Sequence, residues 1–179
     1  MITILGVDIA FRNMGLATMT YDGKSLNVVK LKLVTTEKSP NKQALVSNDD
    51  LRCARELRGA LLAEMWGCDM VMAEIPTGSQ SARASWTLGI STGVLSTIDL
   101  PMIEVSATEG KLASVGKKTA SKQSMIDWAY NKYPKAEWLT TRRKGSWELV
   151  LANEHLADAI AAVHAGIKKQ EFKLIQMGQ

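Results

Sequence analysis

Two acidic residues each follow a short apolar segment of the kind that forms a buried β-strand. Side chains at the ends of neighbouring strands can gather at one edge of a sheet. Asp8 comes directly after residues 2–7, and Glu74 comes directly after residues 70–73. If the two strands are neighbours, both carboxylates reach the same edge of the sheet. Carboxylates held together without a cation raise each other's pKa, and oxygen ligands favour Mg²⁺ or Mn²⁺ over zinc. The pair therefore predicts a site for divalent cations.

A third set of candidate ligands lies near the start of a predicted helix over residues 153–167. His155 and Asp158 are three residues apart and share one face, among alanines that would let the helix lie close to the sheet. Taken singly, each residue has an alternative interpretation. His155 would be a surface histidine, and Asp158 would be a surface carboxylate paired with a lysine. As an ordered set with the two strand-end carboxylates, they favour phosphoryl transfer assisted by two metal ions, with His155 as a ligand or a general acid or base.

The elements that must position these residues are predicted from apolar periodicity and turn residues. The order of strands and helices indicates an α/β fold with a mixed central sheet. The first three predicted strands form an antiparallel meander, and two more strands follow, at residues 2–7, 14–19, 26–34, 70–73 and 101–105. The predicted helices are residues 47–66, 81–98, 107–114, 120–132 and 153–167. Residues 134–147 are expected to be irregular, and the tail after residue 167 is not assigned.

Composition limits the class of protein. The chain has 179 residues, of which 46% are hydrophobic and 22% charged, a balance typical of a globular protein. We expect a single domain over residues 1–179, with Cys53 and Cys68 reduced and buried and with no secretory leader. The longest stretch without charge, residues 84–98, is only 15 residues and is too polar to span a bilayer. A soluble, cytoplasmic protein is expected.

The net charge of +4 is unevenly distributed. Residues 111–144 contain nine basic and two acidic residues, a local sum of +7, which leaves −3 for the remainder. Half of the ten aromatic residues also lie between Trp128 and Trp147. This mixture suits neutralisation of phosphates together with stacking on bases. A solvated helix face with tryptophans in the core is an equally good interpretation from charge alone.

Four short segments form an ordered set of motifs: Gly6 to Ala10, Gly15 to Ala17, Ala73 to Ile75 and His155 to Ala161. Together they resemble the RuvC family of Holliday junction resolvases. Each is weak alone, but in this order and in this strand and helix context they are fairly specific, and the resemblance extends over about residues 1–167. It implies an RNase H-like fold with a mixed five-stranded sheet flanked by helices.

The resemblance also implies an activity, the cutting of four-way (Holliday) junctions by symmetric paired nicks. The family's four metal-binding positions correspond here to Asp8, Glu74, His155 and Asp158. They imply two Mg²⁺ ions per active site, replaceable by Mn²⁺. Asp8 is then expected to bridge the two ions, and Lys122 to stabilise charge on the scissile phosphate.

The resemblance further assigns DNA contacts. Two lysines of the family that contact DNA look similar to Lys111 and Lys122, and Lys117 and Lys118 are expected to add phosphate contacts. The alternative for these lysines is a solvated face. Residues 133–151 are longer than the family pattern, and Arg142, Arg143 and Lys144 are expected to form an added DNA-binding loop.

The resemblance also implies a homodimer, since family members place two symmetric nicks in a junction with two-fold symmetry. The helix at residues 81–98 resembles the family's dimer helix, and the alternative for it is a core helix. Bacterial members carry an aromatic wedge where this chain has Thr77 and Gly78. This departure favours one alternative, a less selective nuclease of branched DNA or RNA:DNA hybrids. A second alternative is a non-catalytic DNA-binding module, against which all four ligand positions are filled. Together with the longer residues 133–151, the departure at Thr77 and Gly78 is typical of a phage-encoded member, which would act in the cytoplasm of a bacterial host.

Overall fold

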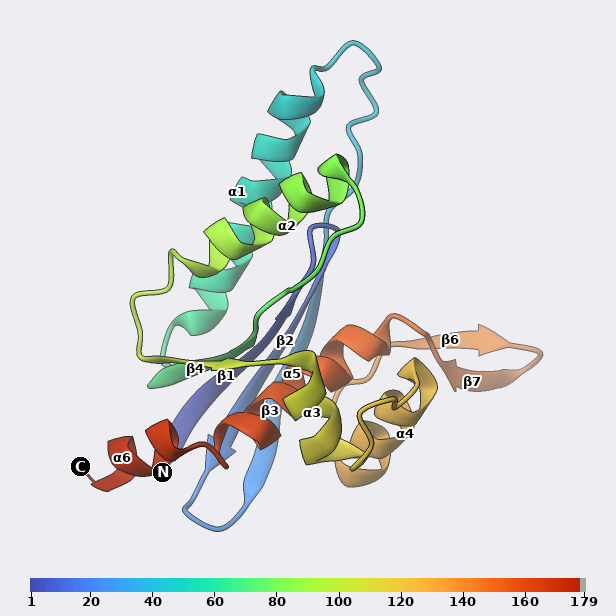
Figure 1. The fold of residues 1–179 in the computed structure, drawn as a ribbon. Coiled ribbons are helices and arrows are strands. Elements are labelled where there is room, and N and C mark those ends of the chain that lie inside the picture. The colour runs from blue at the N-terminus through green and yellow to red at the C-terminus, as the bar shows by residue number, and fades with distance from the viewer. Residues whose placement is uncertain (178–179) are drawn as a thin grey trace.

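The computed structural model describes residues 1–177, so the last two residues of the predicted domain, 178 and 179, lie outside it. A five-stranded sheet with the order β3-β2-β1-β4-β5 forms the centre of the molecule (Figure 1). Its strands are β1 (Ile2–Ile9), β2 (Asn13–Tyr21), β3 (Leu26–Thr35), β4 (Met70–Glu74) and β5 (Met102–Val105). The first three pair antiparallel, whereas β4 pairs parallel to both β1 and β5. The predicted mixed sheet is confirmed.

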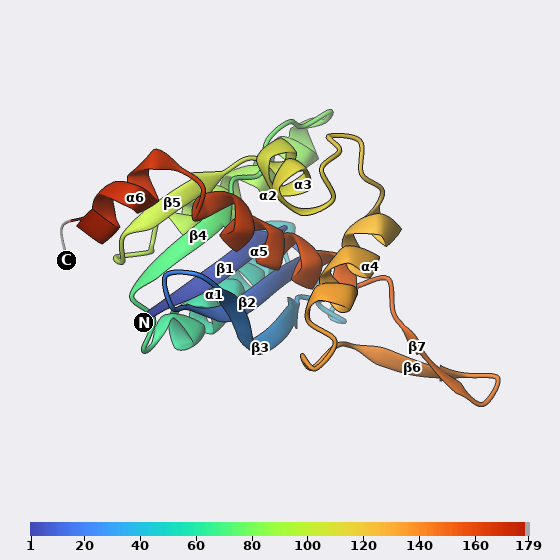
Figure 2. The same ribbon diagram turned by 90° about the horizontal axis from the view of Figure 1, so that it is seen from below.

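Helices cover both faces of this sheet, which explains why its central strands are apolar on both sides (Figures 1 and 2). One layer consists of α1 (Val46–Met65) and α2 (Ala82–Leu95). The other consists of α3 (Ala107–Ser114), α4 (Lys122–Lys132), α5 (Asn153–Gly166) and α6 (Gln170–Met177). Leu5 and Val7 of β1 pack into the first layer's core, while Ile4 packs into the second. Side chains that alternate along one strand thus fill two cores.

Helix α5 packs closely against the first two strands, and glycines allow this approach. A β-carbon added to Gly6 would overlap the carbonyl group of Ala159, and one added to Gly15 would overlap the carbonyl group of His155. The alanines of α5 complete the contact, since Ala159 is fully buried. This approach, predicted from the small residues of the helix, holds the start of α5 over the ends of β1 and β2.

The prediction that residues 134–147 are irregular is wrong. They contribute to a two-stranded hairpin of β6 (Thr140–Arg143) and β7 (Ser146–Leu149), which extends away from the sheet (Figures 1 and 2). Lys144 and Gly145 form its two-residue turn, with φ angles of 47° and 90°, as a type I′ turn requires. Because almost every residue of the hairpin is exposed, its strands lack the apolar alternation by which a strand is recognised.

Two smaller differences concern the tail and the cysteines. The unassigned tail forms α6, which is anchored by the buried ring of Phe172. Cys53 is buried as predicted, but Cys68 is only partly buried because it lies just after the end of α1. None of the helices in residues 1–177 is both long enough and apolar enough to cross a membrane.

Candidate active site

The parallel pairing of β1 with β4 brings Asp8 and Glu74 together. The two residues are direct partners in the register, so their side chains point to the same face of the sheet. Glu74 is the last residue of its strand, whereas Asp8 lies one residue before the end of β1 rather than beyond it. Both carboxylates also line one cleft of about 370 Å³, together with Thr77 and Ser91.

The start of α5 adds His155 and Asp158 to this place. The His155 Nδ1 atom lies 2.7 Å from Asp8 Oδ2, and the two side chains are only 16% and 15% exposed. Burial by itself would lower the pKa of His155, but the hydrogen bond with Asp8 and the negative charges of nearby carboxylates together outweigh burial and raise that pKa above its usual value. The imidazole is thereby held in a fixed orientation against the strand-end carboxylate.

The surroundings of the remaining two carboxyl groups, Glu74 and Asp158, disfavour their ionised forms. Burial, followed by the negative charges of Asp8 and Asp158, raises the pKa of Glu74 to about 8. Burial, followed by the charge of Asp8, raises the pKa of Asp158 to about 7, although His155 opposes the shift. Both groups therefore retain protons near neutral pH unless a cation offsets the repulsion. This is the behaviour expected of carboxylates brought together without a cation.

The donor set fits a divalent metal ion. Within residues 1–177, no three His, Cys, Asp or Glu side chains as they stand are gathered closely enough to hold one ion. The charge of Asp8 contributes, after burial, to both raised pKa values, so a cation at this place would relieve that repulsion. Carboxylate oxygens are the ligands that Mg²⁺ and Mn²⁺ prefer. Because His155 turns Nδ1 towards Asp8, its Nε2 atom is the nitrogen that could ligate.

Two of the predicted basic residues lie at the edge of this site. Lys111 on α3 is half-buried, and its charge lowers the pKa of both Glu74 and Asp158, against the larger effect of burial. Lys122, the first residue of α4, has a side chain that is 70% exposed and holds an ion pair with Glu154. Both cations therefore border the carboxylates.

Glu154 is a site residue that the sequence did not reveal. Its carboxylate is only 13% exposed, and its oxygens lie 2.7 and 2.9 Å from Lys122 Nζ. Its Oε1 atom also lies 3.6 Å from the Nε2 atom of His155, so it connects the lysine with the imidazole. The only sequence signal was its place beside His155, because the partner Lys122 is 32 residues away in the chain.

The other predicted DNA contacts lie on the same side of the sheet (Figure 2). Lys117 and Lys118 are exposed between α3 and α4, whereas Arg142, Arg143 and Lys144 are exposed on the β6–β7 hairpin. Buried Asn153 secures the base of this hairpin, since its side chain bonds the backbone of Leu139 and Val150.

The aromatic residues among these basic residues have divided roles. Trp128, Tyr133 and Trp138 pack against the core. Trp147 on β7 is 71% exposed and lies opposite Arg142 across the hairpin. Three of these aromatic residues therefore belong to the core, as the alternative to base stacking expected. The exposed ring of Trp147 is the one most available to stack on a base.

The predicted dimer helix, α2, packs through one face and exposes the other. Ser91, Val94 and Leu95 are buried, while Gly89 and Gly93 are exposed with open space beside them. Trp86, one turn before Gly89, is 57% exposed. The helix is thus a covering element of the sheet with a free outer face, rather than a helix buried on all sides.

In comparisons with known proteins, no family model matches the chain and no curated protein matches it significantly. Solved structures do match over almost its whole length. Two are structures of Thermus thermophilus RuvC, one in complex with a Holliday junction substrate, with TM-scores of 0.66 and 0.63 and sequence identities of 16% and 17%. Each aligns 99% of this chain with 97% of the RuvC chain.

A viral protein also matches, the fowlpox virus resolvase in complex with its substrate Holliday junction DNA. The TM-score is 0.52 at 16% identity, covering 97% of this chain and 99% of the viral one. The chain therefore has the RNase H-like fold of the junction resolvases. The resemblance to RuvC drawn from the short motifs is confirmed at the level of the fold.

Proposed function

We propose that this chain is a divalent-metal-dependent endonuclease that resolves four-way DNA junctions. The observation that carries the proposal is the meeting of Asp8, Glu74, His155 and Asp158 at one end of β1, β4 and α5. The fold that presents these side chains is shared with a bacterial and a viral protein whose structures contain Holliday junction DNA. The same observation favours catalysis over a purely binding role, because uncompensated buried carboxylates would hinder binding of phosphates.

Asp8, Glu74, Asp158 and the Nε2 atom of His155 would hold two Mg²⁺ ions, or Mn²⁺ in their place. When bound, such ions supply an activated water and stabilisation of the leaving oxygen of the phosphodiester. The chain itself contributes orientation, because the hydrogen bond between His155 Nδ1 and Asp8 fixes the imidazole. It also contributes an open cleft of about 370 Å³ beside Asp8 and Glu74, into which a DNA strand could enter.

Lys122 would stabilise the negative charge that develops on the scissile phosphate. Its exposed amine is held at the edge of the carboxylates by Glu154, so it is already positioned where a phosphate would lie. Lys111 lies on the opposing helix α3 and would offset the carboxylate charge that repels DNA. Both roles follow from the electrostatic cost of bringing a polyanion to an acidic site.

Lys117, Lys118 and the β6–β7 hairpin would bind the arms of the junction. A two-stranded ribbon of this kind fits the width of a DNA groove. The exposed Arg142 and Arg143 offer charge for phosphates, and the exposed Trp147 offers a surface for an unpaired base. Lys144 lies at the tip of the ribbon, in its turn.

We further propose that the chain acts as one domain over residues 1–179 and as a homodimer through the exposed face of α2. A four-way junction with two-fold symmetry needs two cuts at equivalent positions, which two copies of one active site supply. The free face around Gly89 and Gly93 would allow two helices to approach closely. Cutting DNA inside a bacterial cell places this activity in the cytoplasm.

The test is cleavage of a mobile four-way junction with Mg²⁺ or Mn²⁺, with linear duplex, a flap and an RNA:DNA hybrid as parallel substrates. Asp8→Asn should lower the cleavage rate at least a hundredfold and leave junction binding in metal-free buffer nearly unchanged. The matched control is Asp99→Asn, an exposed aspartate at the opposite end of β5 from the cleft.

Paired symmetric nicks in the junction, absent in Asp8→Asn, would support the proposal. Equal cutting of flaps or hybrids would instead favour the less selective nuclease, for which the loop with Thr77 and Gly78 in place of an aromatic wedge is the supporting observation. Binding without cutting in either metal would contradict catalysis and leave a DNA-binding module.

A further inference from the structure

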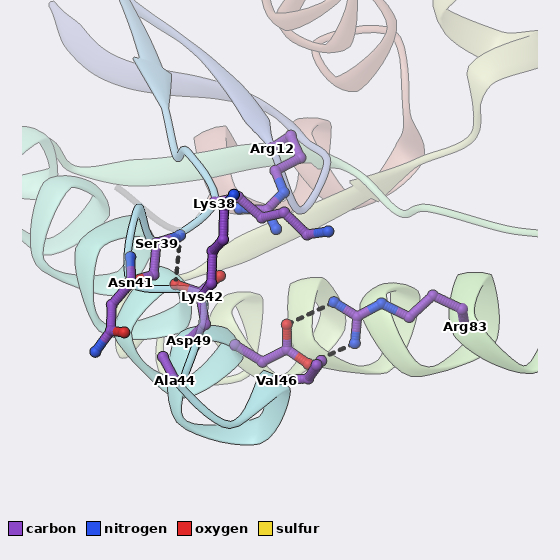
Figure 3. Close-up of a pocket in the computed structure, with 10 residues that line it drawn as sticks. Arg12, Lys38, Ser39, Asn41, Lys42, Ala44, Val46, Asp49 and Arg83 are labelled. Carbon is purple, nitrogen blue, oxygen red and sulfur yellow. Dashed lines mark hydrogen bonds and ion pairs between the residues drawn. The ribbon is translucent and has the colours of Figure 1, made fainter.

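A second basic cluster lies outside residues 111–144. It surrounds a pocket of about 300 Å³ between the β1–β2 turn, the loop after β3 and the starts of α1 and α2 (Figure 3). Four cations and two carboxylates are among its lining residues: Arg12, Lys38, Lys42, Arg83, Asp49 and Asp50. The sequence did not indicate this cluster, because these residues are dispersed over 72 positions in which the charges nearly balance.

Hydrogen bonds between distant segments build the pocket. Thr36, which follows β3, donates from its backbone N–H to the Arg12 carbonyl oxygen at 3.0 Å and from its hydroxyl to the Phe11 carbonyl oxygen at 2.8 Å. The backbone N–H of Ser39 donates to Asp49 of α1 at 3.2 Å. These bonds fix the loop that carries Lys38 against the turn that carries Arg12.

The two carboxylates of the pocket are already satisfied. Asp50, whose side chain is 3% exposed, accepts two hydrogen bonds from Arg83 and a third from Trp86 Nε1 at 2.9 Å. Asp49 accepts hydrogen bonds from Arg52, the shorter at 2.6 Å. These bonds hold the pKa of both carboxyl groups below the usual value, so both are ionised and paired at neutral pH.

Three cations of the pocket therefore have no carboxylate partner. Within residues 1–177, Arg12, Lys38 and Lys42 form no ion pair, and Figure 3 shows them beside the paired Arg83 without such a contact. The Arg12 side chain lies with Nη1 3.3 Å from Cys53 Sγ and with its guanidinium 4.7 Å from the centre of the Phe11 ring, and its charge also acts on Asp49 and Asp50. Because both carboxylates are already bonded to other arginines, the three unpaired cations leave the pocket attractive to a further anion.

The pocket adjoins the carboxylate cleft. Phe11 separates the two, since it lines the cleft with Asp8 while Arg12 and Arg83 lie against its ring. Arg12 follows Asp8 by only four residues, across the turn that connects β1 with β2. An extended anionic chain bound at the carboxylates would reach this pocket by passing over Phe11.

We infer that Arg12, Lys38 and Lys42 form a second phosphate-binding site, which holds the DNA strand that passes through the carboxylate cleft, on the flank away from the β6–β7 hairpin. The inference rests on the proposed function and extends it. The strand is held on both sides of the cut, by Lys111 and Lys122 on one flank and by this cluster on the other. Its contacts go to phosphates, so it adds affinity without sequence preference.

The test is the salt dependence of junction binding, measured by fluorescence anisotropy in metal-free buffer so that no cutting occurs. Each phosphate contact contributes about 0.9 to the slope of log affinity against log salt. Lys38→Gln combined with Lys42→Gln should therefore reduce the slope by about 1.8, and the advantage of the wild type should grow about tenfold from 200 to 50 mM salt. Both lysines are exposed and form no hydrogen bond in the described chain, so the double variant should keep its melting temperature.

The matched control is Lys24→Gln combined with Lys173→Gln, which removes the same charge from exposed positions on the β2–β3 turn and on α6. A slope reduced in the pocket variant but not in the control supports the inference. Equal slopes in the two double variants overturn it while leaving the proposed function intact. Wild type that fails to bind a junction overturns both.

A further experiment tests whether the ligand of this pocket is the DNA backbone or a free anion. If inorganic phosphate at millimolar concentration stabilises the wild type but not the pocket variant, while junction slopes stay equal, then the pocket holds a small anion and the inference is wrong. If phosphate only competes with the junction, and competes less well against the pocket variant, the DNA strand is the ligand.

Discussion

Glu74 and Asp158 are the residues whose ionisation the folded structure disfavours most strongly. Their pKa values of about 8 and about 7 lie well above the ordinary values of 4.5 and 3.8. The folded chain therefore retains protons that the unfolded chain releases between about pH 4 and pH 8. In this window the metal-free protein loses stability as the pH rises, because unfolding frees carboxyl groups to ionise.

The expected result is a metal-free protein that is more stable at pH 5 than at pH 8.5, by roughly 4 kcal/mol. Mg²⁺ should raise the melting temperature most at the higher pH, because it binds the ionised carboxylates. Thermal unfolding across this range, with and without Mg²⁺, measures both effects. Glu74→Gln should flatten the pH dependence, and Asp99→Asn, at an exposed position, should not. An unchanged pH dependence in Glu74→Gln would contradict the assignment.

The ion pair between Lys122 and Glu154 leads to a second prediction at the scale of single residues. Because Lys122 would stabilise charge at the scissile phosphate, Lys122→Met should slow single-turnover cleavage about a hundredfold while weakening junction binding much less. Glu154→Gln keeps the lysine but removes the ionic partner that positions it, so a smaller loss of about tenfold is expected. Cleavage at saturating protein and binding in metal-free buffer separate the two effects. Glu171→Gln, at an exposed position on α6, is the control. Cleavage by Lys122→Met at the wild-type rate would contradict the role proposed for Lys122.

At the scale of elements, the approach of α5 to the sheet places His155. Gly15 has no room for a β-carbon, so Gly15→Ala should push the start of α5 outwards. The expected cost is about 1–3 kcal/mol of stability, and cleavage should fall because His155 leaves Asp8. Gly59→Ala on α1 is the matched control, since nothing lies near its added β-carbon and alanine favours a helix. Chemical denaturation and junction cleavage together provide the measurement, and wild-type cleavage by Gly15→Ala would refute this account of α5.

Prediction of the elements succeeded where a local pattern specified them and failed where it did not. The five strands were found because apolar runs end at turn residues, and the helix at residues 107–114 matched α3 in both bounds. The β6–β7 hairpin was missed because its exposed basic residues show no alternation. The short helix α6 was missed for a different reason, since its main anchor, Phe172, acts only through contact with the distant β-sheet core.

At the scale of the whole molecule, the proposed paired cuts require two copies of the active site, and hence a dimer. Gly89→Arg on the exposed face of α2 should prevent two copies from meeting there, without loss of fold, because open space surrounds this glycine. We expect dimers to become monomers, and linearisation of a cruciform plasmid to become single nicking. Light scattering and the ratio of linear to nicked plasmid measure these changes. Gly59→Arg, an equally open helical position on α1, is the control, and a dimer that survives Gly89→Arg would place the interface elsewhere.

The basic surface also belongs to the whole molecule. The sequence located a block of positive charge at residues 111–144, but the structure separates it into Lys111 and Lys122 at the carboxylates and the extended hairpin beyond. It adds the cluster of Arg12, Lys38 and Lys42 from segments that are close to neutral as a linear sequence. Charge along a chain predicts the presence of an anion-binding face, whereas its path depends on which segments the fold brings together.

The sequence alone determined the order of the five sheet strands and of helices α1 to α5, and the two carboxylates at the ends of β1 and β4. It could do so because burial imposes a periodicity of two or 3.6 residues, and because parallel neighbours end at the same edge of a sheet. Only the tertiary structure decided that His155 contacts Asp8, that Glu154 holds Lys122, and that three separate cations share one pocket. Those contacts join residues that are up to 147 positions apart, and no local pattern encodes which of many possible partners a side chain meets.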